Sequence, residues 1–356
     1  MMALPSSGSR MEAKIWSNLP DEVVERILAR LPAESFLCLR CVCKRWNALL
    51  SSPSFVSLCC KISHRPWLVM FRRRDHRICR AYDIFISKWH NISLCFLPYQ
   101  TAEVVAASGG LLCLRTPFSL SVCNPLTKTW REFPFYSHEH NWCAIALVAE
   151  EGPKGYKIVV AGSSLDRRTE AYDSITDSWK RTEDLPLRTN LRYEATYCDG
   201  VLYFTTSDHF VIMGYNLQRG SWSRVEAPMP ESLICNRLVS CGNRLYIVGG
   251  VGHNGISRSI WVWELSQDGR EWREVQKLPE MMCKKFLAIC YHNYEHISCV
   301  GHEDYICLSC FTSPEVLVYK LSRRTWHWLP RCPYIPDEAS YGFKWFSFIP
   351  SLYALV

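Results

Sequence analysis

Two Cys-x-x-Cys pairs, Cys38/Cys41 and Cys307/Cys310, have a spacing that zinc sites use. Four such thiolates could bind a zinc ion tetrahedrally. However, the first pair lies in helix-like sequence and the second in strand-like sequence, and neither has the glycine turn of a zinc knuckle. We therefore interpret both pairs as packing residues and expect no metal site.

Histidines gather at His292, His296 and His302. Catalysis would need a metal constellation, or a nucleophile beside a positioned base. Their segment instead has the pattern of an inner strand and its turn, and the chain has no glycine-rich phosphate loop and no Gly-x-Ser-x-Gly motif. We expect no catalytic residues and no cofactor.

Basic residues cluster in three places: Arg72, Arg73 and Arg74; Arg167 and Arg168; and Lys284 and Lys285. Arginine can bind carboxylates and phosphates with two parallel hydrogen bonds, so these runs are compatible with an acidic or phosphorylated partner. The alternative is an ordinary solvated surface. The net charge of +7 is mild for 356 residues and does not indicate general nucleic-acid binding.

The composition is that of a folded protein, with 48% apolar and 21% charged residues. No apolar run approaches the ~18 residues that a membrane-spanning helix needs, and the first residues lack the apolar stretch of a secretory signal. The 19 cysteines are odd in number and scattered through apolar segments. We expect reduced thiols in a protein of the cytoplasm, the nucleus or both.

The first part of the chain has a helical pattern over residues 14–62. The apolar residues Val23, Val24, Ile27, Leu28 and Leu31 recur with the helical period and predict one buried stripe. Pro20 suits a first helical turn, and Pro32 ends this helix and can open the next. We expect further short helices over residues 33–41, 44–50 and 54–61.

From Trp67 onward the pattern changes to short β-rich runs with an internal repeat. Tryptophans recur at intervals of about 41 to 54 residues, as do four-stranded propeller blades. An aromatic residue or cysteine stands seven residues before the tryptophan in five of the six repeats, and an Asx residue follows it in four, which predicts an outer hairpin. The repeat tryptophans are Trp89, Trp130, Trp179, Trp222, Trp272 and Trp326.

A second hairpin precedes the first in each repeat, with glycines at its turn, as in Cys241-Gly-Asn-Arg-Leu. Two hairpins make a four-stranded blade, so the sequence predicts an all-β, six-bladed propeller. The first repeat lacks an inner strand. Residues 342–349 alternate apolar and polar side chains, have no repeat of their own, and can supply the missing strand, which would close the ring.

Strand alternation assigns the connections to two faces of the ring. The helical segment enters at the start of a second strand, on the side of the short turns, so we expect the opposite side to bind a partner. The connections expected there cover residues 72–77, 135–141, 163–168, 252–257, 280–285 and 331–340, which also contain His253 and the three basic runs.

The helical segment resembles the F-box family through Leu19-Pro20-Asp-Glu-Val-Val, Ile27-Leu28, Leu31-Pro32 and Cys41-Val42-Cys43-Lys44-Arg45-Trp46-Asn47. The repeats resemble those of plant F-box/kelch-repeat proteins, although only the fifth retains a Gly249-Gly250 strand end. This resemblance implies that the segment binds a Skp-type adaptor, and through it cullin and RING subunits. The residues implied in that interface are Leu19, Pro20, Ile27, Leu31, Pro32, Val42, Cys43 and Trp46.

The resemblance therefore implies a flexible terminus (1–13), an F-box helical module (14–62) and a kelch-type propeller (63–356) that holds a protein substrate. The chain would be a non-catalytic subunit of an SCF ubiquitin ligase, with the basic runs and His253 on the candidate substrate face. Three alternatives stay open: a helical cap without a partner, a propeller that binds proteins outside a ligase, and a kelch-type enzyme. Membrane association is not expected.

Overall fold

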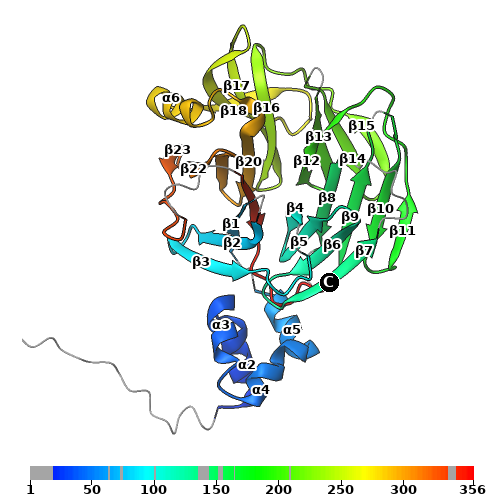
Figure 1. The fold of residues 1–356 in the computed structure, drawn as a ribbon, viewed down its shortest axis with the longest axis vertical. Helices are drawn as coiled ribbons and strands as arrows, with labels where there is room; N and C mark the ends of the chain where they lie inside the picture. The colour runs from blue at the N-terminus through cyan, green and yellow to red at the C-terminus, as the bar shows by residue number, and fades with distance from the viewer. Residues whose placement is uncertain are drawn as a thin grey trace, which may run out of the picture. The chain divides into compact units, whose positions relative to one another are not determined.

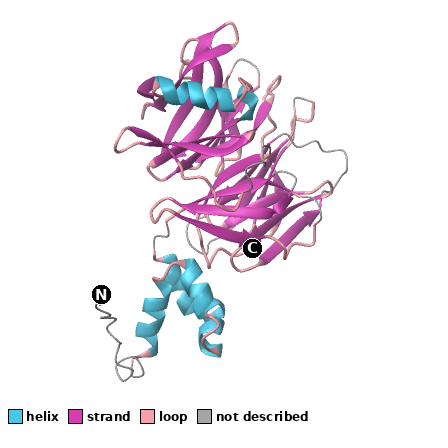
Figure 2. Ribbon diagram, turned by 60° about the vertical axis from the view of Figure 1, so that its left-hand side comes forward, coloured by secondary structure: helices cyan, strands magenta, loops and turns pink. Residues whose placement is uncertain are grey.

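The computed structural model describes residues 19–62, 65–72, 75–99, 102–134, 144–150, 155–163, 165–207, 210–335 and 342–356. The chain divides into two compact units, Met1–His64 and Arg65–Val356. Helices make up the described part of the first unit, and strands dominate the second (Figure 2). The N-terminal residues 1–13, for which we predict flexibility, lie outside the described residues.

The described part of the first unit contains four short α-helices and a 3₁₀ helix. They are α2 (Asp21–Ala29), α3 (Ala33–Leu39), α4 (Lys44–Ala48), η1 (Leu49–Ser51) and α5 (Pro53–Cys60). Pro20 and Pro32 directly precede α2 and α3, which confirms the predicted helix starts. Phe36 stacks on Phe55 at 5.1 Å between ring centroids and joins α3 to α5. No helix in the described ranges is long and apolar enough to cross a membrane.

The second unit consists of six antiparallel sheets of four strands each, numbered here as blades in chain order. Blade 1 is β24 (Phe343–Phe348), β1 (Trp67–Arg72), β2 (Asp75–Asp83) and β3 (Lys88–Ser93). Blade 2 is β4 (Glu103–Ser108), β5 (Leu111–Arg115), β6 (Ser119–Asn124) and β7 (Thr129–Pro134). Blade 3 is β8 (Ala144–Ala149), β9 (Tyr156–Ala161), β10 (Thr169–Asp173) and β11 (Ser178–Arg181).

The other three blades follow the same order. Blade 4 is β12 (Leu191–Cys198), β13 (Val201–Thr206), β14 (Ile212–Asn216) and β15 (Ser221–Arg224). Blade 5 is β16 (Leu233–Cys241), β17 (Arg244–His253), β18 (Ile256–Leu265) and β19 (Trp272–Lys277). Blade 6 is β20 (Ile297–His302), β21 (Tyr305–Cys310), β22 (Ser313–Lys320) and β23 (Thr325–Trp328).

The first strand of each sheet lies at the centre of a closed ring (Figure 1). Contacts run from β24 to β4, β8, β12, β16, β20 and back to β24. The C-terminal strand β24 pairs antiparallel with β1 from Trp67↔Phe348 to Arg72↔Phe343. Both the six-bladed propeller and its closure by the C-terminal strand are thus confirmed.

The repeated aromatic pairs hold the outer hairpins together. Tyr82 lies opposite Trp89 in the β2–β3 register, and their rings are 4.9 Å apart. The equivalent pairs in blades 3, 4 and 6 have ring separations of 5.4, 5.0 and 4.7 Å. Blade 5 differs in residue type, because Leu265 is the residue opposite Trp272 in the β18–β19 register, whereas Trp263 lies opposite Glu274.

Asx residues close the turns of these hairpins, as their spacing predicts. Asp83 Oδ1 accepts hydrogen bonds from the backbone N–H groups of Phe85 and Ile86, at 2.9 and 3.2 Å. Asn124, Asp173 and Asn216 do the same in blades 2, 3 and 4. The Asx side chain directly before each turn therefore fixes the geometry of that turn.

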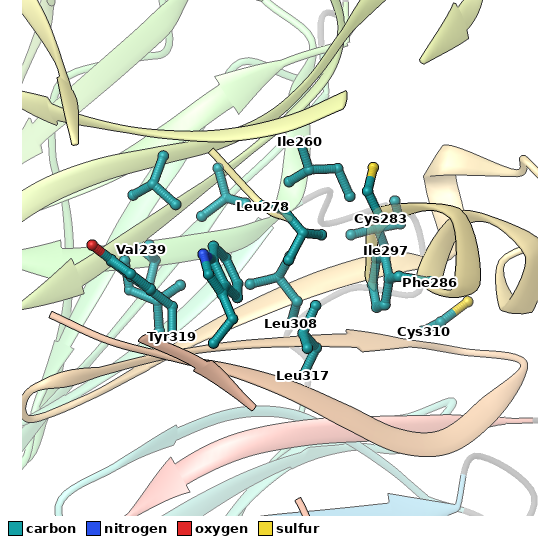
Figure 3. Packing of buried hydrophobic residues seen from close by; sticks show 14 of the residues in the cluster. Val239, Ile260, Leu278, Cys283, Phe286, Ile297, Leu308, Cys310, Leu317 and Tyr319 are labelled. Atoms are coloured by element: carbon teal, nitrogen blue, oxygen red, sulfur yellow. The ribbon is translucent and has the colours of Figure 1, made fainter. Parts of the chain in front are cut away.

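A helix stands where a loop over residues 280–285 was expected. α6 (Glu280–Ile289) connects blades 5 and 6 and is followed by η2 (Tyr294–His296). Its buried side chains follow the helical spacing i, i+3, i+4, i+7, and Figure 3 shows Cys283 and Phe286 packed against Ile260 and Ile297. The expectation of a loop was wrong because the repeat pattern hid this short helical period.

One buried arginine fixes the segment that leads from α6 into blade 6. Arg237 in β16 is 8% exposed. Its Nε donates to the Ile297 carbonyl at 2.6 Å, and its Nη2 donates to the carbonyls of Tyr294 and Glu295 at 2.9 and 3.2 Å. A single buried guanidinium therefore donates to three backbone carbonyls of η2 and the start of β20.

His302 lies buried where blade 6 meets blade 1, and its Nδ1 is 3.4 Å from Ser347 Oγ of β24. Burial lowers its pKa to about 4, although the Pro66 backbone and Asp83 favour protonation. A depressed histidine pKa contributes stability that is present above pH 6.5 and is lost as the pH falls toward 4. We expect His302 to account for a loss of about 3 kcal/mol over this window.

The replacement His302→Gln isolates this contribution, because glutamine stays neutral and all other titrating groups are unchanged. Urea unfolding at a series of pH values should give a shallower loss of stability for the variant between pH 6.5 and 4. Parallel pH profiles for the two proteins would show that His302 does not couple closure of the ring to pH.

Candidate functional site

The helical unit keeps its core and its predicted interface apart. The buried apolar residues are Leu28, Ala29, Ala33, Phe36, Leu49, Phe55 and Cys59. The eight residues implied in adaptor binding are all at least partly exposed: Pro20, Ile27, Pro32, Val42 and Cys43 are exposed, and Leu19, Leu31 and Trp46 are half-buried. The interface residues are therefore available without disturbing the core.

The exposed apolar side chains come from two places in the helical unit, α2 and the connection between α3 and α4. Ile27 is 38% exposed on α2, and Val42, between α3 and α4, is 62% exposed. Arg45 Nη1 pairs with Asp21 Oδ1, so α4 lies beside the beginning of α2. The structure thus brings Pro20 close to the helix that carries Trp46, whereas Leu31 and Pro32 lie beyond the other end of α2.

Cys43 has a structural role as well as an exposed position. It precedes α4 with an extended backbone, and its Sγ accepts from the Trp46 N–H at 3.5 Å. This side chain takes the place of the usual oxygen at a helix N-cap. Cys43 therefore helps to orient the helix on which Trp46 stands.

Val23 is an interface candidate that the sequence reading missed. It lies one turn before Ile27 on α2 and has the same exposure. The stripe on this helix was expected to be buried throughout, but only Leu28 is buried and Val24 is half-buried. The expectation was wrong because a bundle this small covers only part of an apolar helix face.

The strand order gives the propeller two distinguishable faces. On the turn face, where β1 begins, lie the turns that connect first to second and third to fourth strands. On the loop face lie the connections from second to third strands and from each blade to the next. The predicted partner-binding connections all belong to the loop face, of which residues 73–74, 135–141, 164 and 336–340 lie outside the described part.

Four of the basic residues predicted on the loop face have partners within the protein. Arg167 Nε donates to the Leu185 carbonyl at 2.6 Å. Arg168 Nε lies 3.0 Å from Asp166 Oδ1. The hydrogen bond that Lys284 donates to Glu280 raises the pKa of Lys284, and the two side chains are 2.6 Å apart.

Lys285 lies 3.1 Å from Glu315 and over the ring of Trp328 at 4.2 Å.

The predicted substrate-face residues come from different blades: Arg72 from blade 1, Arg167 and Arg168 from blade 3, and His253 from blade 5. Arg73 and Arg74 lie outside the described residues. The prediction of a basic substrate face is untested, and the paired charges leave it with less free positive charge than the sequence indicates.

The two Cys-x-x-Cys pairs fall in separate units. Cys38 lies in α3 and Cys41 follows it, and both are exposed, whereas Cys307 and Cys310 are buried in β21. Across the described ranges, no three His, Cys, Asp or Glu side chains come together as metal ligands. His302 belongs to β20, but His292 and His296 lie in the connection before it rather than in an inner strand.

Comparison with protein families matches both parts of the chain. Residues 16–61 match the F-box domain, and residues 50–288 match the KIB1-4 beta-propeller. An F-box/kelch-repeat protein of Arabidopsis thaliana is 36% identical over 375 residues, which cover 99% of this chain and 91% of that protein.

Two further relatives from Arabidopsis thaliana also match along most of their length. F-box only protein 6 is 28% identical and covers 90% of this chain and 71% of its own. Protein UNUSUAL FLORAL ORGANS is 25% identical and covers 92% of this chain and 82% of its own. The crystal structure of the nidogen/laminin complex shares the fold, with a TM-score of 0.51 and 10% identity over 82% of this chain and all of that one.

Proposed function

This chain belongs to the plant F-box/kelch-repeat family, and from that premise we propose that it is the substrate-recognition subunit of an SCF ubiquitin ligase. Its helical unit binds a Skp-type adaptor, which connects it to a cullin and a RING subunit. Its propeller binds a protein substrate for ubiquitination and degradation. We place this activity in the cytoplasm, the nucleus or both.

The exposed apolar surface of the helical unit is the observation that carries this proposal. Val23, Ile27 and Val42 remain exposed although apolar side chains gain about 1.5–3 kcal/mol each when fully buried. An unpaired apolar surface on so small a unit indicates an interface with another protein. The match of residues 16–61 to the F-box domain supports a Skp-type adaptor as that protein.

The chain itself performs no chemistry in this proposal. It holds a substrate lysine near a ubiquitin-charged E2 enzyme, so that transfer depends on effective concentration rather than on free encounter. Substrate choice belongs to the propeller, and assembly belongs to the helical unit. This division fits the separate cores of the two units.

Reconstitution tests the proposal directly. The purified full-length chain should form a stable complex with a recombinant plant Skp-type adaptor, and adding the cullin, RING subunit, E1, E2 and ubiquitin should allow ubiquitin transfer to bound protein. Trp46→Ala should weaken the adaptor complex at least about tenfold, whereas Ile175→Ala, an exposed replacement in blade 3, should not. If the wild-type chain binds no adaptor, a propeller that binds proteins outside a ligase becomes the better description.

A further inference from the structure

The connections between second and third strands carry a large apolar residue in every blade where they are described. These residues lie at or next to the tips of the connections in blades 2 to 6: Phe118, Leu165, Phe210, Ile256 and Phe311. Three of them, Phe118, Leu165 and Ile256, are 68%, 96% and 55% exposed. Tight turns usually have glycine, asparagine, aspartate or serine at such positions, so this repetition calls for an explanation.

The equivalent turns on the other side of the same strands show the usual chemistry. The described turns between first and second strands contain only small or polar residues: Gly109-Gly110, Asp199-Gly200, Gly242-Asn243 and Glu303-Asp304. Both sets connect neighbouring antiparallel strands of the same sheets. Large apolar side chains are therefore not needed to join two strands of a blade. They are not confined to the loop face, because Ile86 and Ile175 are exposed in turns between third and fourth strands. A variant that removes these turn-face side chains is therefore the control for a variant of the loop-face tips.

The turns themselves do not need these apolar side chains. Thr116 Oγ1 accepts from the backbone N–H groups of Phe118 and Ser119 at 3.2 and 2.9 Å and so closes the blade 2 connection. Ser163 Oγ accepts from the N–H groups of Leu165 and Asp166 at 3.2 and 3.3 Å. The Asn254-Gly255 pair, with φ of 53° and 73°, forms the blade 5 turn before Ile256.

Connections between blades add more apolar side chains to the same face. Exposed residues of this kind are Leu187, Met281, Tyr291 and Tyr334. Four basic side chains of the face, Arg167, Arg168, Lys284 and Lys285, are held by Leu185, Asp166, Glu280 and Glu315 respectively. The described connections thus offer a partner several exposed apolar side chains, and four of their basic side chains are already paired within the protein.

We propose that the loop face binds its protein partner through the apolar tips of the connections between second and third strands. The matching partner segment has large aliphatic or aromatic side chains and few charges, rather than acidic or phosphorylated residues. This inference rests on the proposed function, in which the propeller holds the substrate. Contacts from several blades would bury apolar area at each tip while leaving the paired charges at the rim.

A displayed library of short random peptides provides a defined probe for this surface. The full-length chain serves as bait, beside a tip variant with Phe118→Ser, Leu165→Ser and Ile256→Ser. A turn-face variant with Ile86→Ser, Ile175→Ser and Leu355→Ser is the matched control, since these residues are also exposed. All six replacements remove exposed side chains, so melting temperatures should stay close to that of the wild type.

We expect the selected peptides to be rich in leucine and aromatic residues and to bind the tip variant at least about tenfold more weakly than the wild type. Binding to the turn-face variant should be unchanged, and about 0.5 M sodium chloride should have little effect. Selection of acidic peptides that depend on Lys284 and Lys285 would overturn the inference, as would peptides that bind the tip variant normally. Selection of no peptide that separates the baits would overturn it too.

Adaptor binding separates failure of this inference from failure of the proposed function. The tip variant should bind the Skp-type adaptor as the wild type does, because the replacements lie only in the propeller. A wild-type chain that selects tip-dependent apolar peptides but binds no adaptor would contradict the ligase assignment alone. A chain that binds the adaptor but selects no tip-dependent peptides would contradict the apolar loop face alone.

Discussion

Ile27→Asp and Val42→Asp should each weaken binding of the chain to a Skp-type adaptor by about 100-fold or more. Both side chains are exposed, at 38% and 62%, and would become buried against the adaptor. A carboxylate in a desolvated interface has no partner there, and interface hot spots cost about 2–4 kcal/mol when lost. Isothermal titration calorimetry with the full-length chain would measure the change.

A core replacement distinguishes loss of the interface from loss of the fold. Phe36→Ala should destabilise the helical unit by about 3–5 kcal/mol, because Phe36 is buried and stacks on Phe55. The two aspartate variants should instead keep the wild-type circular dichroism spectrum. Normal adaptor affinity in Ile27→Asp and Val42→Asp would show that the apolar surface on α2 and before α4 is not the docking surface.

The repeating parts of the structure could be predicted from the sequence because each has a strong local cause. Tyr82 and Trp89 stand seven residues apart with Asp83 between them, so one hairpin places the rings together and closes its own turn. The strand β24 followed from counting, because blade 1 had too few strands of its own. These are consequences of periodicity, which a sequence displays directly.

Which apolar side chains of α2 are buried and which are exposed could not be predicted in the same way. Val23 and Leu28 belong to one helical period, yet the first is exposed and the second is buried. In a unit this small the same stripe serves both the core and the surface. Periodicity identifies an apolar face but does not say whether the covering partner lies within the chain.

The partners of the basic side chains were the other feature that could not be predicted from the sequence. Lys285 reads as a free charge beside Lys284, but in the fold it meets Glu315 and Trp328 of blade 6. Such contacts depend on how α6 packs, and the repeat pattern hid α6 itself. The spacing of Cys283, Phe286, Leu287 and Cys290 contained a helical signal that could have revealed it.

Arg237→Met should reduce the free energy of unfolding of the propeller by about 3–5 kcal/mol. The replacement keeps most of the aliphatic side chain but removes donors to the carbonyls of Tyr294, Glu295 and Ile297. Each buried carbonyl left without a donor costs about 1–3 kcal/mol. Urea unfolding followed by tryptophan fluorescence would measure the loss.

Arg192→Met is the matched control, because Arg192 pairs with Glu295 of the same segment at 3.0 Å, but Glu295 is mostly exposed. An ion pair at the surface contributes only about 0–1 kcal/mol. The two arginines thus contact the same connection in different ways. Arg237 donates to buried backbone carbonyls, whereas Arg192 pairs with a carboxylate that is exposed to water. Equal losses for the two variants would mean that hydrogen bonds from Arg237 to these carbonyls stabilise the segment no more than the exposed ion pair of Arg192 does.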